Sequence, residues 1–312
     1  MSLPSSSPAP QTAPGASEAR KGVIAAVITP MLWGGLPILF RLVEEAGAVM
    51  IVAERTLWSL LLLAGILAFT GGFGAVKSVF ADWRRVRDTA LAAALLAANW
   101  LIYVWAVERG QVLEASFGYF INPLVNVLIG MVLLGERQNR LQTISIAMAA
   151  VAILIQAVGL GTIPYISLGL ALTFGFYGYI RKTAHLGPAA GLFAETAMLA
   201  PVAAVYVAFM LASQGPGVHA DPVKLVLLML TGPATAVPLL LFGYAVRRLR
   251  FSTMGMIQYI TPTLQFLVAT LLFHEALNGW RLFSFALIWV SLMVFSYDGF
   301  RRRRSRARAV PL

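Results

Sequence analysis

The chain has 312 residues, of which 59% are hydrophobic and only 12% are charged, and its mean hydropathy is +0.79. A soluble domain of this length would carry about 25% charged residues, so the composition excludes an ordinary soluble fold. The sequence contains no cysteine, which also excludes disulfides and thiolate metal sites. The composition therefore indicates an integral membrane protein.

The N-terminal segment, residues 1–20, is rich in Pro, Ser and Ala and is too polar to bury a core. We predict a disordered cytoplasmic tail there. Arg20 and Lys21 precede the first apolar run, an arrangement that is also typical of signal peptides. Because this run continues to Arg41 without a small-residue cleavage site, we predict a membrane-spanning helix and not a cleaved signal.

Apolar runs recur along the rest of the chain, each bounded by charge, Gly or Pro. Each run is long enough to cross roughly 30 Å of hydrocarbon as an α-helix. The sequence therefore predicts an all-α integral membrane protein with ten transmembrane helices. The predicted spans are 23–40, 48–70, 90–107, 112–134, 141–158, 165–180, 190–211, 223–246, 252–273 and 281–298.

The net charge of +11 follows from the placement of basic residues around these spans. If both termini are cytoplasmic, most of the 24 basic residues lie in cytoplasmic segments, as the positive-inside rule requires. The run RRRRSRAR within residues 300–312 directly follows the last span. Such runs also bind nucleic acid or anionic lipid, but in this place we interpret the run as a basic cytoplasmic tail that fixes topology. We predict no nucleic-acid partner.

The strongest internal signal is a repeat. An offset of 139 residues places FINP at 120–123 on YITP at 259–262. A nearby offset of 141 places Trp33-Gly34 on Phe174-Gly175 and Glu54 on Glu195.

The two halves of the chain, residues 21–160 and 161–299, each contain five predicted spans. Because five is an odd number, the second half begins on the opposite side of the membrane, so the repeats are inverted. Inverted repeats are typical of secondary transporters, whose halves exchange shapes to open one site to either side in turn.

Pro123 and Pro262 lie near the middle of the fourth and ninth spans, close to the bilayer midplane. A proline inside a helix removes one backbone hydrogen bond and clashes with the preceding turn, so we expect helix breaks and free carbonyls there. An alternative is that the prolines only kink the helices and the amides hold neighbouring helices together. We predict that the polar and aromatic side chains in this region line a solute-binding cavity: Asn99, Tyr103, Tyr119, Asn122, Gln258, Tyr259 and Thr261.

Charged residues inside spans are costly in a bilayer and are therefore functional candidates. Glu54 and Arg55 lie in the second span, and Glu195 lies at a similar depth in the seventh, entered from the opposite face. Adjacent helical residues do not face each other, so Glu54 and Arg55 need separate partners. We predict that the three side chains pair with substrate or couple protons at two gates. Structural interhelical ion pairs are an equal alternative.

Enzyme signatures are absent from the sequence. It contains no HExxH or GxSxG pattern and its three histidines are isolated, so we predict no catalytic residue, no metal site and no cofactor. There is no Walker A sequence either, so energy for transport would come from a gradient of protons or another ion. A receptor or scaffold is the alternative, although the short extramembrane segments offer little surface for protein partners.

Four stretches resemble one known family: NWLIYVWAV, LEASFGYFINPLVNVLIGMVLLGER, LTFGFYGYIRK and LRFSTMGMIQYITPTLQFLVATLLFHE. They look like the RarD-type, chloramphenicol-sensitivity proteins of the EamA branch of the drug/metabolite transporter superfamily, over roughly residues 20–300. The resemblance implies a ten-helix permease of the bacterial inner membrane with both termini in the cytoplasm. His274-Glu275 departs from the Gly-Glu usual in such proteins, which puts the likeness of the second gate in doubt.

These observations predict a secondary transporter that moves a small organic metabolite or drug-like solute across the inner membrane by alternating access. Its expected partners are the small-molecule solute, the lipid bilayer and an ion gradient. The sequence leaves the substrate, the direction of transport and the oligomeric state open.

Overall fold

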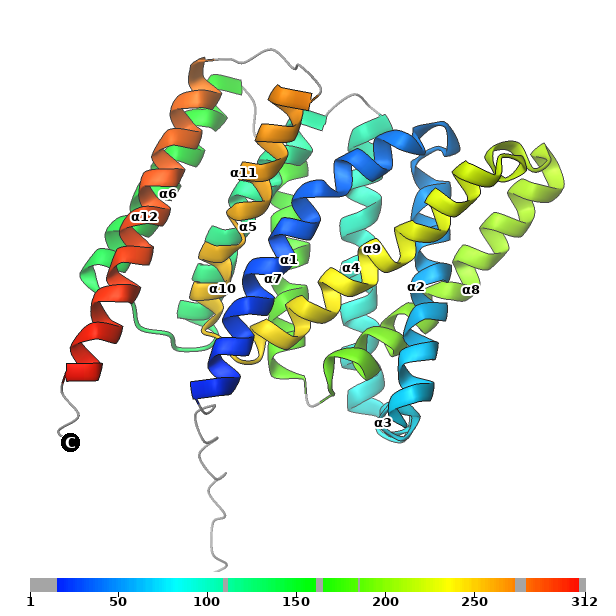
Figure 1. Ribbon diagram of the computed structural model, residues 1–312, viewed down its shortest axis with the longest axis horizontal. Coiled ribbons are helices and arrows are strands. Elements are labelled where there is room, and N and C mark those ends of the chain that lie inside the picture. The colour runs from blue at the N-terminus through cyan, green and yellow to red at the C-terminus, as the bar shows by residue number, and fades with distance from the viewer. Residues whose placement is uncertain (1–15, 109–111, 161–164, 185, 273–278, 309–312) are drawn as a thin grey trace, which may run out of the picture.

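The computed structural model describes residues 16–108, 112–160, 165–184, 186–272 and 279–308, and this part of the chain is helical with no strand (Figure 1). In chain order its α-helices are α1 (Ala16–Leu42), α2 (Ala48–Thr70), α3 (Phe73–Phe80), α4 (Trp83–Glu108), α5 (Val112–Val132), α6 (Arg140–Leu160), α7 (Tyr165–Thr183), α8 (Pro188–Gln214), α9 (Pro222–Val246), α10 (Phe251–Ile257), α11 (Ile260–Leu267) and α12 (Gly279–Arg308). Short 3₁₀ turns lie at η1 (Glu44–Ala46) and η2 (Gly217–Ala220).

The apolar runs predicted from the sequence are helical along most of their described length, with non-helical residues only at 133–134 and 258–259 among the described positions. Outward-facing side chains are strongly apolar; on α8, for example, Val202, Val205 and Phe209 are 65–74% exposed. Such a large apolar surface suits contact with lipid. The chain is therefore an all-α, multi-pass membrane protein. Six segments of the described chain are long and apolar enough to cross a membrane: Ser17–Leu42, Ala48–Thr70, Arg140–Gly159, Pro188–Gln214, Pro222–Val246 and Phe251–Leu272.

The helices at both ends of the chain extend into the predicted tails. α1 begins at Ala16, so the last residues of the segment 1–20 are helical, while residues 1–15 lie outside the described part of the chain. Glu18 explains this start, because its carboxylate accepts hydrogen bonds from Lys21 Nζ, Tyr244 Oη and Arg248 Nε at 2.9–3.1 Å. These bonds tie the start of α1 to the end of α9. At the other end, α12 continues as a helix to Arg308.

The predicted ninth span is not one regular helix. α10 ends at Ile257, α11 begins at Ile260, and a π-helical turn follows at Val268–Leu272. Pro262 has no amide proton for the carbonyl of Gln258, which instead accepts from the backbone nitrogen of Thr261 at 3.0 Å. The carbonyl that the proline frees is thus taken up by a tighter local turn. Pro123, in contrast, lies inside the continuous helix α5.

The helices pack in a bundle through small residues at the closest crossings. α5 packs along α7, α1 along α9, and α2 against both α8 and α9, while α6 and α12 pair at one edge (Figure 1). α10 crosses α5 at Gly255, where an added Cβ would meet the carbonyl oxygen of Pro123 at 2.7 Å. Small residues let membrane helices approach this closely.

Two charged side chains cap helix ends by hydrogen-bonding to their backbone groups. The carboxylate of Glu136 accepts from the backbone nitrogens of Phe251 at 2.5 Å and Ser252 at 3.0 Å, so it caps the start of α10. Lys182 Nζ donates to the carbonyls of Val246 at 3.0 Å and Leu249 at 2.6 Å, at the end of α9. Both side chains satisfy backbone groups that helix ends leave free.

Candidate functional site

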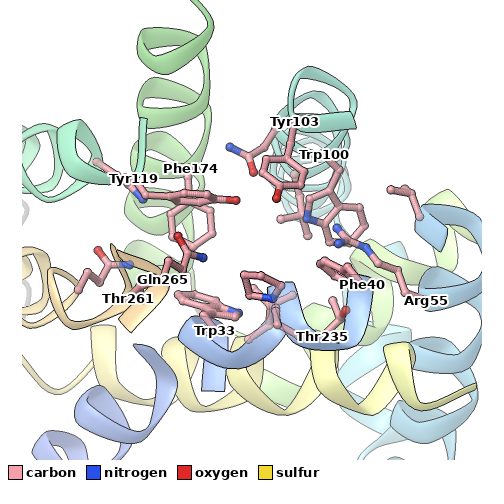
Figure 2. A pocket seen from close by; sticks show the side chains of 18 residues that line it. Trp33, Phe40, Arg55, Trp100, Tyr103, Tyr119, Phe174, Thr235, Thr261 and Gln265 are labelled. Carbon is pink, nitrogen blue, oxygen red and sulfur yellow. The ribbon is translucent and has the colours of Figure 1, made fainter. Parts of the chain in front are cut away.

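A pocket with an empty volume of about 940 Å³, open mouth included, lies within the bundle (Figure 2). Sites for small organic ligands are mostly apolar with a few polar groups, and the side chains around this space have that character. Helices from both halves of the chain contribute to its wall. The side chains that line it are Trp33, Leu36, Pro37, Phe40, Val52, Arg55, Leu96, Asn99, Trp100, Tyr103, Tyr119, Asn122, Phe174, Thr235, Leu239, Gln258, Thr261 and Gln265.

Most of the residues proposed from the sequence as cavity residues meet at this pocket. Six of them line it: Asn99, Tyr103, Tyr119, Asn122, Gln258 and Thr261. Tyr259 does not line it; this side chain is completely buried, and its hydroxyl has no hydrogen-bond partner in the described part of the chain. Of the three charged candidates, only Arg55 lines the pocket.

Positions related by the sequence repeat occur together in the pocket wall. Tyr119 and Asn122 of the first half line it, and so do their counterparts Gln258 and Thr261. Trp33 and Phe174 are also related by the repeat, and their rings meet edge to face with centroids 5.4 Å apart. These two aromatic residues were not predicted as cavity residues, although the repeat had already paired them.

The amides near the pocket serve partly to join helices. Asn99 Nδ2 donates to the carbonyl oxygen of Leu170 at 2.9 Å and to Thr173 Oγ1 at 3.0 Å, which joins α4 to α7. Asn126 donates to the side-chain oxygen of Gln258, which joins α5 to α10. Asn122 differs, because its buried Oδ1 has no hydrogen-bond partner among the described residues. An acceptor left free at the pocket wall is available to a solute.

Arg55 is the one charged residue among the described residues that line the pocket. Its guanidinium lies over the ring of Trp100, with Cζ 3.8 Å from the ring centroid. The residue is only 8% exposed, and its Nε and Nη2 atoms are buried without a hydrogen-bond partner in the described chain. Aromatic stacking thus holds one face of the cation, while Nε and Nη2 have no acceptor among the described residues.

Glu54 does not line the pocket and pairs with the connection before α9. It accepts from Trp58 Nε1 at 2.8 Å, and its Oε1 lies 2.7 Å from Nε2 of His219 in η2. The other ring nitrogen of His219 lies 3.1 Å from the carbonyl oxygen of Pro216, which can only accept. Both ring nitrogens therefore lie beside oxygen atoms, and the side chain of His219 links Glu54 to the backbone at Pro216.

Glu195 belongs to a second buried cluster that the sequence did not reveal. Arg181 Nη1 lies 3.1 Å from Glu195 Oε1, and the hydroxyl of Tyr177 donates to Glu195 Oε2 at 3.2 Å. Arg181 Nη2 also donates to the carbonyl oxygen of Pro188 at 3.0 Å. Arg181 directly follows the predicted span 165–180, yet its side chain is only 3% exposed. Its spacing of four from Tyr177, which places both on one helical face, was the available signal.

Comparison with known proteins places this architecture in a family. Residues 20–157 match the model of the EamA-like transporter family. An uncharacterized transporter of Pseudomonas aeruginosa is 41% identical over 288 residues, covering 91% of this chain and 96% of the relative. The protein RarD of Escherichia coli is 37% identical over 294 residues, covering 94% and 99%.

Two further comparisons extend this result. The protein RarD of Streptomyces exfoliatus is 40% identical over 295 residues, covering 94% of this chain and 93% of the relative. A crystal structure of a protein only 18% identical superposes with a TM-score of 0.68 over 89% of this chain and 96% of the other, which shows a shared fold. Relatives named as transporters or as RarD thus match nearly the whole chain, and the chain belongs to the EamA-like transporter family, among the RarD proteins of the drug/metabolite transporter superfamily.

Proposed function

We propose that this protein is a secondary transporter that moves a small organic solute across the bacterial inner membrane by alternating access, with the central pocket as its binding site. One observation carries the proposal: residues related by the repeat, Asn122 with Thr261 and Trp33 with Phe174, line the same pocket. A site shared by two related halves can be opened to one side and then the other when the halves exchange shapes.

The pattern of helix packing supports ten crossings arranged as two inverted halves, residues 21–160 and 161–299. In the repeat, α1 corresponds to α7, α2 to α8, α4 to α9, and α5 to α10 and α11 together. Replacing each helix of the α1–α9 contact by its counterpart gives the α7–α4 contact. The same exchange turns α5–α7 into α11–α1 and α2–α9 into α8–α4. All of these pairs are in contact, as two halves of related fold require. Pro123 and Pro262 occupy matching places in α5 and α11, where each weakens its helix.

The proposed orientation places both termini in the cytoplasm. The start of α1 and the end of α12 lie at the same end of the bundle, together with α3 and the α7–α8 and α9–α10 connections (Figure 1). Most of the basic residues belong to these segments. The positive-inside rule therefore favours this end as the cytoplasmic one.

Glu54 and Glu195 are the proposed charge-coupling residues of the two gates. α2 starts at one end of the bundle and α8 at the other (Figure 1), so the pairs Glu54–His219 and Arg181–Glu195 lie toward opposite ends. Polar pairs between helices can hold one end closed while the other is open. We propose a proton gradient as the energy source, because the carboxylate of Glu54 and the imidazole of His219 are both groups that can take up and release protons.

Transport by reconstituted protein tests the function. A thermal-shift screen of the purified protein against amino acids, nucleotides, sugar phosphates and amphenicols identifies ligands, because a ligand that binds only the folded state raises its melting temperature. Flux of each ligand into proteoliposomes is then measured. We expect Asn122→Ala and Thr261→Ala to lower flux and Ser213→Ala, exposed on α8, to leave it unchanged. Unchanged flux in both pocket variants at normal expression would contradict the site. Binding without flux would favour a receptor.

A further inference from the structure

Arg55 combines three properties that other cations of the described chain do not share. It is buried, it lines the pocket, and no carboxylate of the described residues lies within 4 Å of it. Arg181 provides the comparison, because this equally buried arginine is matched by Glu195 and by the carbonyl oxygen of Pro188. A buried cation without a partner is costly in a low-dielectric interior. Among the described residues, one buried arginine is thus matched by a carboxylate and the other is not.

The residues around Arg55 hold its guanidinium in place, but the described residues give no hydrogen-bond acceptor to Nε or Nη2. Trp100 covers one face of the guanidinium, and Figure 2 shows the hydroxyls of Tyr103 and Tyr119 pointing into the same cavity. Stacking on an aromatic face orients the planar fork of an arginine, whose parallel N–H groups fit the two oxygens of a carboxylate or phosphate. Phenolic hydroxyls can donate further hydrogen bonds to such an oxyanion.

The other residues that line the pocket indicate the chemistry of the rest of the ligand. Trp33, Phe40 and Phe174 present aromatic faces, and Asn122 presents a free amide oxygen. Among the described residues that line the pocket, none is acidic, so the wall offers no counter-ion for an ammonium group. A single cation balances a single negative charge, which favours a carboxylate over the dianion of a phosphate monoester.

We propose that the pocket selects small organic monocarboxylates with an aromatic or apolar body, and that Arg55 binds the carboxylate. This assignment of substrate class rests on the proposed function, because it concerns the same site. The carboxylate supplies the partner that the described residues do not give to Arg55, and the body of the solute packs against the aromatic wall.

Binding of four related probes to the full-length protein in nanodiscs tests the assignment without requiring transport. Phenylacetate carries the proposed group, phenylacetamide is its neutral analogue, phenylalanine adds an ammonium group, and phenyl phosphate replaces the carboxylate. Trp33 and Trp100 lie in the pocket wall, so quenching of tryptophan fluorescence reports occupancy. We expect phenylacetate to bind at least about tenfold more tightly than phenylacetamide, since hydrogen bonds to charged groups contribute that much or more.

Three variants assign this preference to the arginine. Arg55→Gln should reduce the preference for phenylacetate over phenylacetamide to about onefold, while Arg55→Lys should retain part of it because the charge remains. Arg84→Gln, a change of an exposed arginine on α4, should leave the preference intact. Melting curves of the ligand-free variants show whether each one folds, and Arg55→Lys keeps the test informative if Arg55→Gln does not.

Several outcomes would overturn the assignment. These are equal affinity for phenylacetate and phenylacetamide, tighter binding of phenylalanine or phenyl phosphate, an unchanged preference in Arg55→Gln, or no binding of any probe. Flux measurements separate this result from the function itself. Carboxylate-selective binding that depends on Arg55 but gives no flux would retain the ligand class and reject transport. Flux of solutes without a carboxylate, unaffected in Arg55→Gln, would retain transport and reject the class.

Discussion

Oε1 of Glu54 lies 2.7 Å from Nε2 of His219, although 165 positions separate the two residues in the chain. The contact joins α2 to η2, the turn before α9, and Trp58 Nε1 donates to the same carboxylate. Hydrogen bonds to a charged group contribute about 1.5–3 kcal/mol each. This pair is therefore expected to stabilise the end of the bundle at which α2 begins.

Replacing Glu54 should separate the effect of its hydrogen bonds from that of its charge. We expect Glu54→Ala to lower the free energy of unfolding by at least about 1.5–3 kcal/mol, the contribution of one hydrogen bond to a charged group. Glu54→Gln should lose much less, because its amide can accept from Trp58 and donate to a neutral His219. Denaturant or thermal unfolding in detergent measures both. Equal losses in the two variants would argue that hydrogen bonding at this position does not stabilise the protein.

The Arg181–Glu195 pair should show strong coupling. Removing either charge alone leaves the other buried and unpaired, which typically costs about 3–5 kcal/mol. We expect Glu195→Leu and Arg181→Met to be strongly destabilising as single changes and the double variant to be more stable than either. A double-mutant cycle on unfolding free energies measures the coupling. Simple addition of the two single effects would contradict the contact at 3.1 Å.

Gly232 should be sensitive to even one added methyl group. A Cβ at this position would overlap Trp58 and Ser59 of α2, meeting the Trp58 carbonyl carbon at 2.6 Å and the Ser59 nitrogen at 2.7 Å. Gly232→Ala is expected to cost about 1–3 kcal/mol, since overpacking forces the helices apart. Gly65→Ala is the matched control, because a Cβ on Gly65 meets nothing within 4 Å and alanine favours the helix. Melting temperatures should fall for the first variant and not for the second.

Glu136 should act as a helix cap. Its carboxylate accepts from the backbone nitrogens of Phe251 and Ser252 and from Ser252 Oγ. Loss of a capping side chain costs about 0.5–2 kcal/mol, and we expect Glu136→Ala to lose that amount. Glu45→Ala, at an exposed glutamate paired with Lys224, is the control and should change stability by less than about 1 kcal/mol. Hydrogen exchange at the start of α10 would locate the effect.

The sequence by itself determined the helical segments and pointed to part of the pocket wall. Apolar runs long enough to cross a bilayer must be helical there, because only a helix satisfies its own backbone in hydrocarbon. The prolines and their polar neighbours marked the region around Asn122 and Thr261, and both residues line the pocket. The sequence repeat also relates Trp33 to Phe174, and their rings are in contact in the structure.

Only the tertiary structure decided which side chains meet. Three features depend on which helices pack together and on how each is rotated about its axis. They are the partners of Glu54 and Glu195, the burial of Arg181, and the absence of a carboxylate beside Arg55 among the described residues. In a helix that is apolar on most sides, hydrophobic periodicity does not specify that rotation. Tyr259 shows the consequence: it stands beside Gln258 in sequence, but adjacent helical residues point in different directions, and only Gln258 lines the pocket.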